Sequence, residues 1–556
     1  MRAAGHPSWR DKTTVLCAAV LILLGPQAAA QEQTDLDRSD PALLQYDLEG
    51  LEEPGDRRSV RLRIEPSDRQ RLVTDLAPFL VGAVQVDGAV ELEPAIFAPA
   101  IEPFLGRELG AAELERLAGN IAAAARDAGF GLASAWVPRQ DVTSGILRVM
   151  VDEGRIDLVE TSGAAAPLVQ ARLARLVTGG PVRTADLERQ LLLAEDVPGV
   201  RVRGARLEQR DGRNILVVAT EFDRSRGRAS IDNHGSSALG PVRARLSYEL
   251  NGLIDMGDRV SVAISTTPLQ PADYQFVRAI YSRPLGSEGT EVSVGGYAAY
   301  ARPGGRSSTA EIEGSSYEVE VSLVHPLERS RDLSTWVGLD LALRETELNR
   351  TEMLARRDRL ATASLSLLTS GRLGPGVARV RFAAVHGLDI LGATETGAPL
   401  ASREDAGGVF TKIEFSTAFT ASLLGNLSLA LDLEGQLAAD ALLSSEEFGL
   451  GGRRFLRAFE PRAVTGDHGL ASAAELRFDL LRLSSPLRRI QFYAYADGGL
   501  VRNQGGRSGS LISAGGGLRL FLVHRLQANL EFAVPLTSER GEQRPPRLSV
   551  SVENRF

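Results

Sequence analysis

The chain has 556 residues, of which 43% are apolar, with a formal net charge of −8, one cysteine and six histidines. This length exceeds what one hydrophobic core usually serves, so we expect several domains. The acidic balance and the 5% aromatic content argue against a nucleic-acid-binding surface, and one cysteine excludes a disulfide scaffold.

Residues 1–30 have the layout of a secretory signal peptide. Basic residues precede an apolar run from about Val15 to Leu24, and Ala28-Ala29-Ala30 follows as a small-residue cleavage site. Cys17 lies at the start of the apolar run, so we expect the exported chain to have no cysteine. No later stretch approaches the roughly 18 apolar residues that a membrane helix needs. Such an exported chain either folds in the periplasm or spans the outer membrane as a barrel.

Three regions precede the second half of the chain. Residues 31–77 are polar and charged and predict a linker or mobile arm, for which disorder is the favoured interpretation. Residues 78–155 predict a small α+β module, ordered strand, helix, helix, strand, strand, because Leu114, Leu117 and Ile121 recur at helical spacing. Residues 156–222 repeat this layout, which indicates a modular arm.

Residues 223–556 lose the helical period and alternate instead. The run from Leu427 to Gln436 places leucines on one face and Ser, Asp, Glu and Gln on the other, which in a membrane barrel are the lipid and lumen faces. At roughly 20 residues per strand with its turn or loop, this region predicts about sixteen antiparallel strands. The fold class is therefore α+β modules followed by an all-β transmembrane barrel.

A loop in the last third of the chain carries the candidate functional residues. Arg457 lies in a glycine-bounded segment, and Asp497 lies on a strand of alternating small and apolar residues, Tyr495-Ala496-Asp497-Gly498-Gly499. We predict that a loop around residues 449–470 folds into a polar lumen and is held there by a desolvated Arg457–Asp497 pair.

Enzyme signatures are absent from the sequence. There is no G-x-S-x-G, H-E-x-x-H or phosphate-binding G-x-x-x-x-G-K motif, and the histidines are dispersed. We therefore expect no enzymatic activity, no cofactor and no metal ion.

The modules resemble a known pair. The runs Val137–Ile156 and Leu187–Val200 look like the two POTRA domains of two-partner secretion transporters, the haemolysin secretion/activation family, and the resemblance covers nearly the whole exported chain. The POTRA positions that carry it are Pro138, Gln140, Asp141, Gly145, Glu153, Gly154, Asp196, Pro198 and Gly199.

The same resemblance assigns the loop. It implies that Arg457 and Phe459 form the functional tip, with Asp497 as the partner of Arg457, while Ala458 replaces the glycine of the family. If that position needs a positive φ, alanine costs about 1 kcal/mol. The remaining positions are Gly451, Gly452, Gly466, Asp467 and Gly469 as loop supports, Tyr495 and Gly499 in the barrel wall, and Phe556 as the assembly signal.

The resemblance implies a transporter that receives an unfolded exoprotein of haemolysin or adhesin type in the periplasm, through strand edges or helix grooves, and moves it outward. Its expected partners are this exoprotein, outer-membrane lipid and the barrel assembly machinery, with no nucleic acid, and the expected state is a monomer. Two alternatives stay open: an insertase of the same superfamily, which usually has more POTRA domains, and a passive porin.

Overall fold

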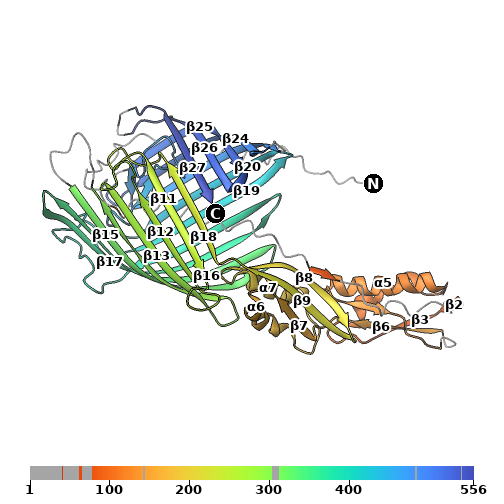
Figure 1. The fold of residues 1–556 in the computed structure, drawn as a ribbon. Coiled ribbons are helices and arrows are strands. Elements are labelled where there is room, and N and C mark those ends of the chain that lie inside the picture. Colours follow the sequence, from red (N-terminus) through yellow and green to blue (C-terminus); the bar gives the residue numbers. More distant parts are fainter. Residues whose placement is uncertain are drawn as a thin grey trace.

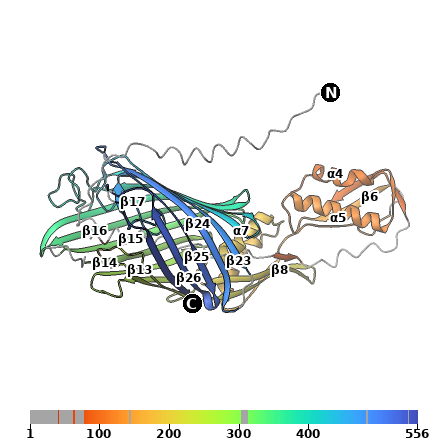
Figure 2. The same cartoon turned by 90° about the horizontal axis from the view of Figure 1, so that it is seen from above.

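The computed structural model describes residues 41, 62–64, 78–141, 145–302, 312–481, 485–506, 508–539, 541 and 543–556. Two small α+β modules lie in a row beside one large β-barrel (Figure 1). Figure 2 shows the first module at the far end of this row, and the second against the barrel. The predicted signal peptide lies outside the described residues.

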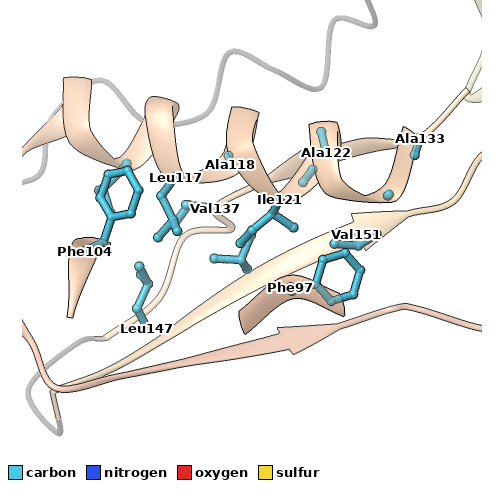
Figure 3. Packing of buried hydrophobic residues seen from close by; sticks show 14 of the residues in the cluster. Phe97, Phe104, Leu117, Ala118, Ile121, Ala122, Ala133, Val137, Leu147 and Val151 are labelled. Carbon is cyan, nitrogen blue, oxygen red and sulfur yellow. The ribbon is translucent and has the colours of Figure 1, made fainter. Parts of the chain in front are cut away.

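The first module packs helix α5 (Ala111–Asp127) against a three-stranded sheet. Its buried face carries Leu114, Leu117 and Ile121, which confirms the predicted helix. Figure 3 shows this face directed toward β6, where Leu147 lies. The other elements are β2 (Phe79–Val81), β3 (Ala83–Asp87), η3 (Pro94–Phe97), α4 (Ala98–Ile101), η4 (Glu102–Phe104), β4 (Arg107–Leu109), β5 (Ser134–Trp136) and β6 (Ile146–Asp152). In the sheet β6 is central, parallel to β3 and antiparallel to β5.

The second module repeats the order strand, helix, helix, strand, strand. Its elements are β7 (Leu158–Ser162), α6 (Ala166–Leu173), η5 (Ala174–Leu176), α7 (Thr184–Glu195), β8 (Val200–Arg210) and β9 (Arg213–Phe222). Leu173, Leu187 and Leu216 belong to one buried cluster between the helices and the sheet.

None of the helices in the described ranges is long and apolar enough to cross a membrane.

Part of the predicted mobile arm is ordered. Leu62–Ile64 form strand β1, which pairs in parallel with Ala205–Leu207 of β8 and so extends the second module's sheet to the order β1-β8-β9-β7. The disorder interpretation of residues 31–77 is therefore wrong for these three residues. Composition favours disorder in this arm because it has little apolar surface to bury. Backbone pairing to the edge of an existing strand needs no apolar surface, so a polar segment can still form a strand.

The second half of the chain is a closed antiparallel barrel, as predicted. Sixteen strands of the described chain pair in sequence order, and the last pairs with the first. They are β10 (Ser225–Asp232), β11 (Arg243–Asn251), β12 (Arg259–Thr266), β13 (Tyr274–Leu285), β14 (Thr290–Ala301), β15 (Ile312–Arg329), β16 (Leu333–Arg350), β17 (Met353–Leu373), β18 (Gly376–Gly387), β19 (Thr411–Leu424), β20 (Leu427–Ala438), β23 (His468–Leu481), β24 (Leu487–Arg502), β25 (Ser508–Leu522), β26 (Leu526–Pro535) and β27 (Arg547–Arg555).

The alternation along the strands separates an apolar exterior from a charged interior. On β16, Leu339, Leu341 and Leu343 are exposed, whereas Arg344 reaches inward to Glu318 and Glu446. Closure leaves no unpaired strand edge, which the lipid interior would penalise because it offers the backbone no hydrogen-bond partner. The same closure creates a polar lumen that other parts of the chain can enter.

Candidate functional site: the loop inside the barrel lumen

The chain between β20 and β23 folds into the lumen. It runs from Ala439 to Asp467 and contains a short hairpin of β21 (Phe448–Leu450) and β22 (Val464–Gly466). The loop begins earlier than the predicted range of 449–470, and it ends at Asp467 because His468 already belongs to β23. Its apolar side chains pack with inward-facing wall residues in one buried cluster that includes Leu450, Leu456, Phe459, Tyr493 and Tyr495.

Arg457 at the tip is surrounded by three carboxylates. Its Nη1 donates to Glu475 Oε2 at 2.8 Å and to Glu531 Oε2 at 3.1 Å, whereas its Nε lies 3.8 Å from Asp497 Oδ2. Its guanidinium also lies over the Tyr495 ring, 3.9 Å from the centroid. We call Arg457, Tyr495, Glu475, Asp497 and Glu531 the tip cluster.

Asp497 holds the backbone of the tip more closely than it holds the guanidinium. Its Oδ2 accepts the backbone N–H of Arg457 at 3.3 Å, and its Oδ1 accepts the hydroxyl of Ser513. Leu456, the neighbouring residue, has a φ of 59°. A carboxylate that receives backbone N–H groups can hold such a turn in place. The geometry therefore places the predicted partner beside Arg457 but divides the ionic contacts of this arginine among three acids.

Ala458 does not occupy the strained position of the tip. Among the described residues of the loop, φ is positive at Gly451, Gly452, Leu456 and Arg462, and Ala458 is not among these positive-φ residues. The expected cost of alanine, which was conditional on a positive φ there, does not arise. Ala458 is instead buried in the apolar cluster, where its methyl group contributes to packing.

The wall opposite the tip is shaped by small residues. A Cβ atom on Gly499 would lie 2.5 Å from Leu450 Cδ2 and 3.3 Å from Leu456 Cδ1, so the loop packs directly on the backbone of β24. Phe459 is almost fully buried, and its carbonyl oxygen accepts a hydrogen bond from Arg547 Nη1 at 3.1 Å. The tip therefore touches both β24 and β27.

A second polar cluster holds the base of the loop. Asp467 is fully buried and pairs with Arg403 Nη1 at 2.6 Å, and its carboxylate also accepts the backbone N–H groups of Leu442 and Gln504. The same Arg403 nitrogen lies 2.7 Å from Glu447 Oε1. We call Asp467, Arg403 and Glu447 the base cluster. Since Arg403 belongs to the loop between β18 and β19, this cluster joins separate loops at the outer end of the barrel.

The predicted glycines lie where these segments approach one another. A Cβ on Gly451 would meet Glu460 O at 2.1 Å, and one on Gly469 would meet the ring of Phe448 at 2.0 Å. A Cβ on Gly466 would lie 2.8 Å from Asn503 Oδ1, and Gly452 has a φ of 119°. Substitution of Gly466 or Gly469 would push the loop away from its neighbours in the barrel, whereas substitution of Gly451 or Gly452 would distort the loop itself.

Sequence reasoning missed most of the charged partners. Glu475, Glu531 and Arg403 carry no motif of their own, and they come from separate segments of the chain. The one available signal is alternation, because acids at inward positions of β23 and β26 must face the lumen. Which of these acids would meet Arg457 depends on how deeply the loop enters.

Two groups of predicted positions stabilise the modules. The buried carboxylate of Glu153 accepts the backbone N–H groups of Val90, Glu91 and Leu92. Gly154 follows with a φ of 87°, and its carbonyl oxygen accepts the N–H of Val182 in the second module. These residues therefore fix a loop of the first module and its connection to the second.

The other group closes the hairpin end of the first module. The Gln140 amide accepts the N–H of Arg148 at 2.8 Å and donates to its carbonyl at 2.7 Å, as a strand neighbour would, and also donates to Pro138 O at 3.3 Å. Asp141 is exposed, and the carbonyl of Gly145 accepts the N–H groups of Gly82 and Ala83.

Asp196 joins the second module to the barrel. Its two carboxylate oxygens accept Arg329 Nε and Nη2 at 2.7 and 2.8 Å, and Arg329 also lies over the ring of Trp336. Pro198 and Gly199 form the following turn, and the carbonyl of Gly199 accepts the N–H of Asp223 just before β10. These positions form a junction between the two parts of the chain.

We expect Asp196→Ala to loosen this junction. The change leaves the Arg329 guanidinium, whose side chain is only 7% exposed, without its bidentate carboxylate, which costs roughly 3 kcal/mol when a buried pair is broken. The distribution of distances between a spin label on α7 and one on the turn at residues 330–332 should broaden. As a control, Arg175→Ala removes an exposed pair with Glu288 and should leave the distribution narrow. Equal distributions in both variants would contradict the assignment.

Phe556 lies at the seam of the barrel. Its backbone exchanges two hydrogen bonds with Gly227 of β10, and a Cβ on Gly227 would lie 2.2 Å from its ring. The residue is 60% exposed, and its ring lies next to that of Tyr248. Its predicted role as an assembly signal stays a prediction.

Within the described ranges no group of His, Cys, Asp or Glu side chains could hold a metal ion.

Comparison with known proteins identifies the family. The family model described as haemolysin secretion/activation protein ShlB/FhaC/HecB matches residues 211–520, and the ShlB-type POTRA model matches residues 79–154. Outer membrane transporter CdiB of Escherichia coli is 23% identical over 520 residues, covering 90% of this chain and 85% of that protein. Heme/hemopexin transporter protein HuxB of Haemophilus influenzae (strain 86-028NP) is 22% identical over 460 residues, covering 78% and 80%.

The solved structures agree in fold. CdiB from Escherichia coli superposes with a TM-score of 0.73 at 21% identity, over 95% of this chain and all of that one. BamA from Haemophilus ducreyi lacking POTRA domains 1-3 gives a TM-score of 0.50 at 13% identity, over 86% of this chain. Since the family model spans more than half of the sequence, the chain belongs to the haemolysin secretion/activation family of two-partner secretion transporters, outer-membrane barrels with periplasmic POTRA domains.

Proposed function

We propose that this protein exports one large partner exoprotein, of haemolysin or adhesin type, as an unfolded chain through its barrel. The observation that carries the proposal is the loop in the lumen, which is held by ion pairs at its tip and at its base rather than by covalent links. Polar contacts of this kind can exchange for contacts with a passing polypeptide or with water. The loop can then leave its docked position while the barrel stays closed.

The modules supply edges at which an extended peptide can pair. In the first module β3 and β5 are the outer strands of the sheet, and in the second module β7 is an outer strand. An extended segment that adds to such an edge gains backbone hydrogen bonds without needing a defined sequence. The opposite edge of the second sheet is already paired with β1, so β3, β5 and β7 are the favoured acceptors.

The lumen suits an unfolded polar chain. Inward side chains of both signs pair along its wall, including Arg278 with Glu320 at 2.6 Å and Arg519 with Glu475 at 2.7 Å. Mixed charges offer hydrogen bonds to a polypeptide without a strong preference for one sign. We propose that folding of the exoprotein outside the cell supplies direction, that the barrel acts as a monomer, and that Phe556 is read by the assembly machinery.

The test is deletion of this gene and complementation with the wild-type gene. We expect the large exoprotein encoded beside it to disappear from the medium on deletion and to return on complementation. Normal export in the deletion strain, together with depletion of other outer-membrane proteins, would instead support the insertase alternative. Normal export with unchanged membrane proteins and loss of small-solute uptake would support a porin.

A further inference from the structure

A cavity lies where the second module meets the rim of the barrel. It has a volume of about 370 Å³ and lies between helix α6 and the turns that follow β11 and β13. The residues that line it include the apolar Leu168, Met256 and Pro284 and the basic Arg172 and Arg283. The cavity is remote from the tip and base clusters, and the contacts of the lumen loop do not involve it.

Arg172 is a buried cation with little compensation from the protein. The residue is 6% exposed, and its Nη1 donates a long hydrogen bond of 3.5 Å to the carbonyl oxygen of Ser287. Burial lowers the pKa of this guanidinium, and the charge of Asp196 partly opposes that shift. A guanidinium has five N–H donors, and a buried charge needs a partner to offset its desolvation. Its position therefore favours an anionic ligand.

The acids that line the cavity are already engaged. Asp258 accepts the backbone N–H groups of Leu253, Ile254 and Asp255 at 2.8 to 3.0 Å, which closes its own turn. Asp255 lies 3.7 Å from Arg283. Neither carboxylate is within ion-pair distance of Arg172 among the described contacts, and Arg172 itself lines the cavity.

The surroundings place the cavity at the membrane boundary. On β13 the outward-facing row contains exposed Val277, and Arg283 and Leu285 follow on the same face at the end of the strand beside the cavity. A cation among apolar residues at the end of such a row is typical of the level of the lipid head groups. In the neighbouring turn, Leu253 and Ile254 are 59% and 76% exposed. Large apolar side chains at this level are stabilised by acyl chains, whereas water alone would penalise them.

We propose that this cavity binds the phosphodiester group of a phospholipid from the periplasmic leaflet. Arg172 neutralises the phosphate from the module, Arg283 approaches it from the barrel, and the apolar turn contacts the glycerol and the first part of the acyl chains. A lipid held in this way bridges the second module and the barrel. The junction is thereby completed by a membrane component in addition to the Asp196–Arg329 pair.

The experiment uses the full-length protein reconstituted in vesicles of phosphatidylglycerol mixed with phosphatidylcholine, extracted in mild detergent and examined by native mass spectrometry. We expect the wild type to retain phosphatidylglycerol, and Arg172→Gln to lower its occupancy by about tenfold, since a hydrogen bond to a charged group contributes roughly 1.5–3 kcal/mol. Arg175→Gln, which changes an exposed arginine just after the same helix, is the matched control and should retain the lipid.

A second variant guards against misfolding of Arg172→Gln. Met256→Glu changes a partly exposed turn residue and puts a negative charge into the cavity, so it should expel the lipid while the barrel keeps its heat-modifiable mobility. Equal lipid occupancy in the wild type, Arg172→Gln and Met256→Glu would overturn the proposal. If inorganic phosphate added to the vesicles before extraction displaces the lipid, the lipid assignment is overturned in favour of a free-anion site. Reduced export by Arg172→Gln with unchanged lipid would overturn it in favour of an acidic exoprotein segment.

Discussion

Arg457→Ala is expected to abolish export while the barrel remains closed. Among the described residues, Arg457 is the cation that lies within 4 Å of both Asp497 and Glu531. Its removal leaves these two buried acids without a cationic partner. Breaking a buried ion pair by removing one partner costs roughly 3–5 kcal/mol, and loss of the stacking contact with Tyr495 adds to this. The sixteen-strand ladder does not depend on Arg457, so the cost falls on docking of the loop. We expect export to be lost because the docked tip is the transport-competent starting position that an arriving exoprotein displaces.

The measurement is the amount of exoprotein in the medium, with heat-modifiable mobility as the test of barrel folding. Arg457→Lys should recover only a fraction of export, because an ammonium group lacks the planar fork that contacts two acids at once. The matched control is Arg454→Ala in the same loop, whose side chain is 46% exposed and pairs with Glu434. We expect that variant to export normally. Wild-type export by Arg457→Ala would falsify the role assigned to the tip cluster.

Asp467→Ala is expected to open the pore from its outer end. Asp467 is fully buried, pairs with Arg403 and receives two backbone N–H groups from separate loops. Loss of about 3 kcal/mol of docking free energy corresponds to a rise of roughly a hundredfold in the undocked population of the loop base. The tip contacts of Arg457 are separate, so partial opening is expected rather than complete release.

Single-channel recording in planar bilayers measures this opening directly, and growth in the presence of a large antibiotic measures it in cells. Asp405→Ala is the control, because Asp405 pairs with Nη2 of the same arginine at 2.8 Å but is 58% exposed, where an ion pair contributes little. We expect higher conductance and antibiotic sensitivity for Asp467→Ala than for Asp405→Ala. Identical traces from the two variants would show that the base cluster does not close the pore.

The two clusters suggest why the loop needs two anchors. The tip cluster fixes Arg457 against β23, β24 and β26, while the base cluster fixes the loop to its neighbours at the outer end. A chain that arrives from the periplasm meets the tip first. Exchange of the tip contacts would free the inner part of the lumen while the base still limits leakage outward.

Local patterns determined much of the architecture. Helical spacing of Leu114, Leu117 and Ile121 predicted α5, and the alternation of leucines with polar residues predicted strands that separate lipid from lumen. Such periodicities are readable because the side-chain direction repeats every 3.6 residues in a helix and every two in a strand. The glycine-bounded arginine also indicates a loop tip, because the flanking glycines favour a turn on either side of it.

The partners of that arginine were decided by the tertiary structure. Sequence predicted one acid, Asp497, whereas closure of the barrel brings Glu475 and Glu531 from two other strands to the same guanidinium. The pairing of β1 with β8, the anchor from Arg403 and the buried Arg172 depend in the same way on segments distant in sequence. By itself the sequence determined which faces are polar, because that depends on neighbouring residues. Which charges meet depends on the strand register and on the depth to which the loop enters the lumen, and only the closed fold sets both.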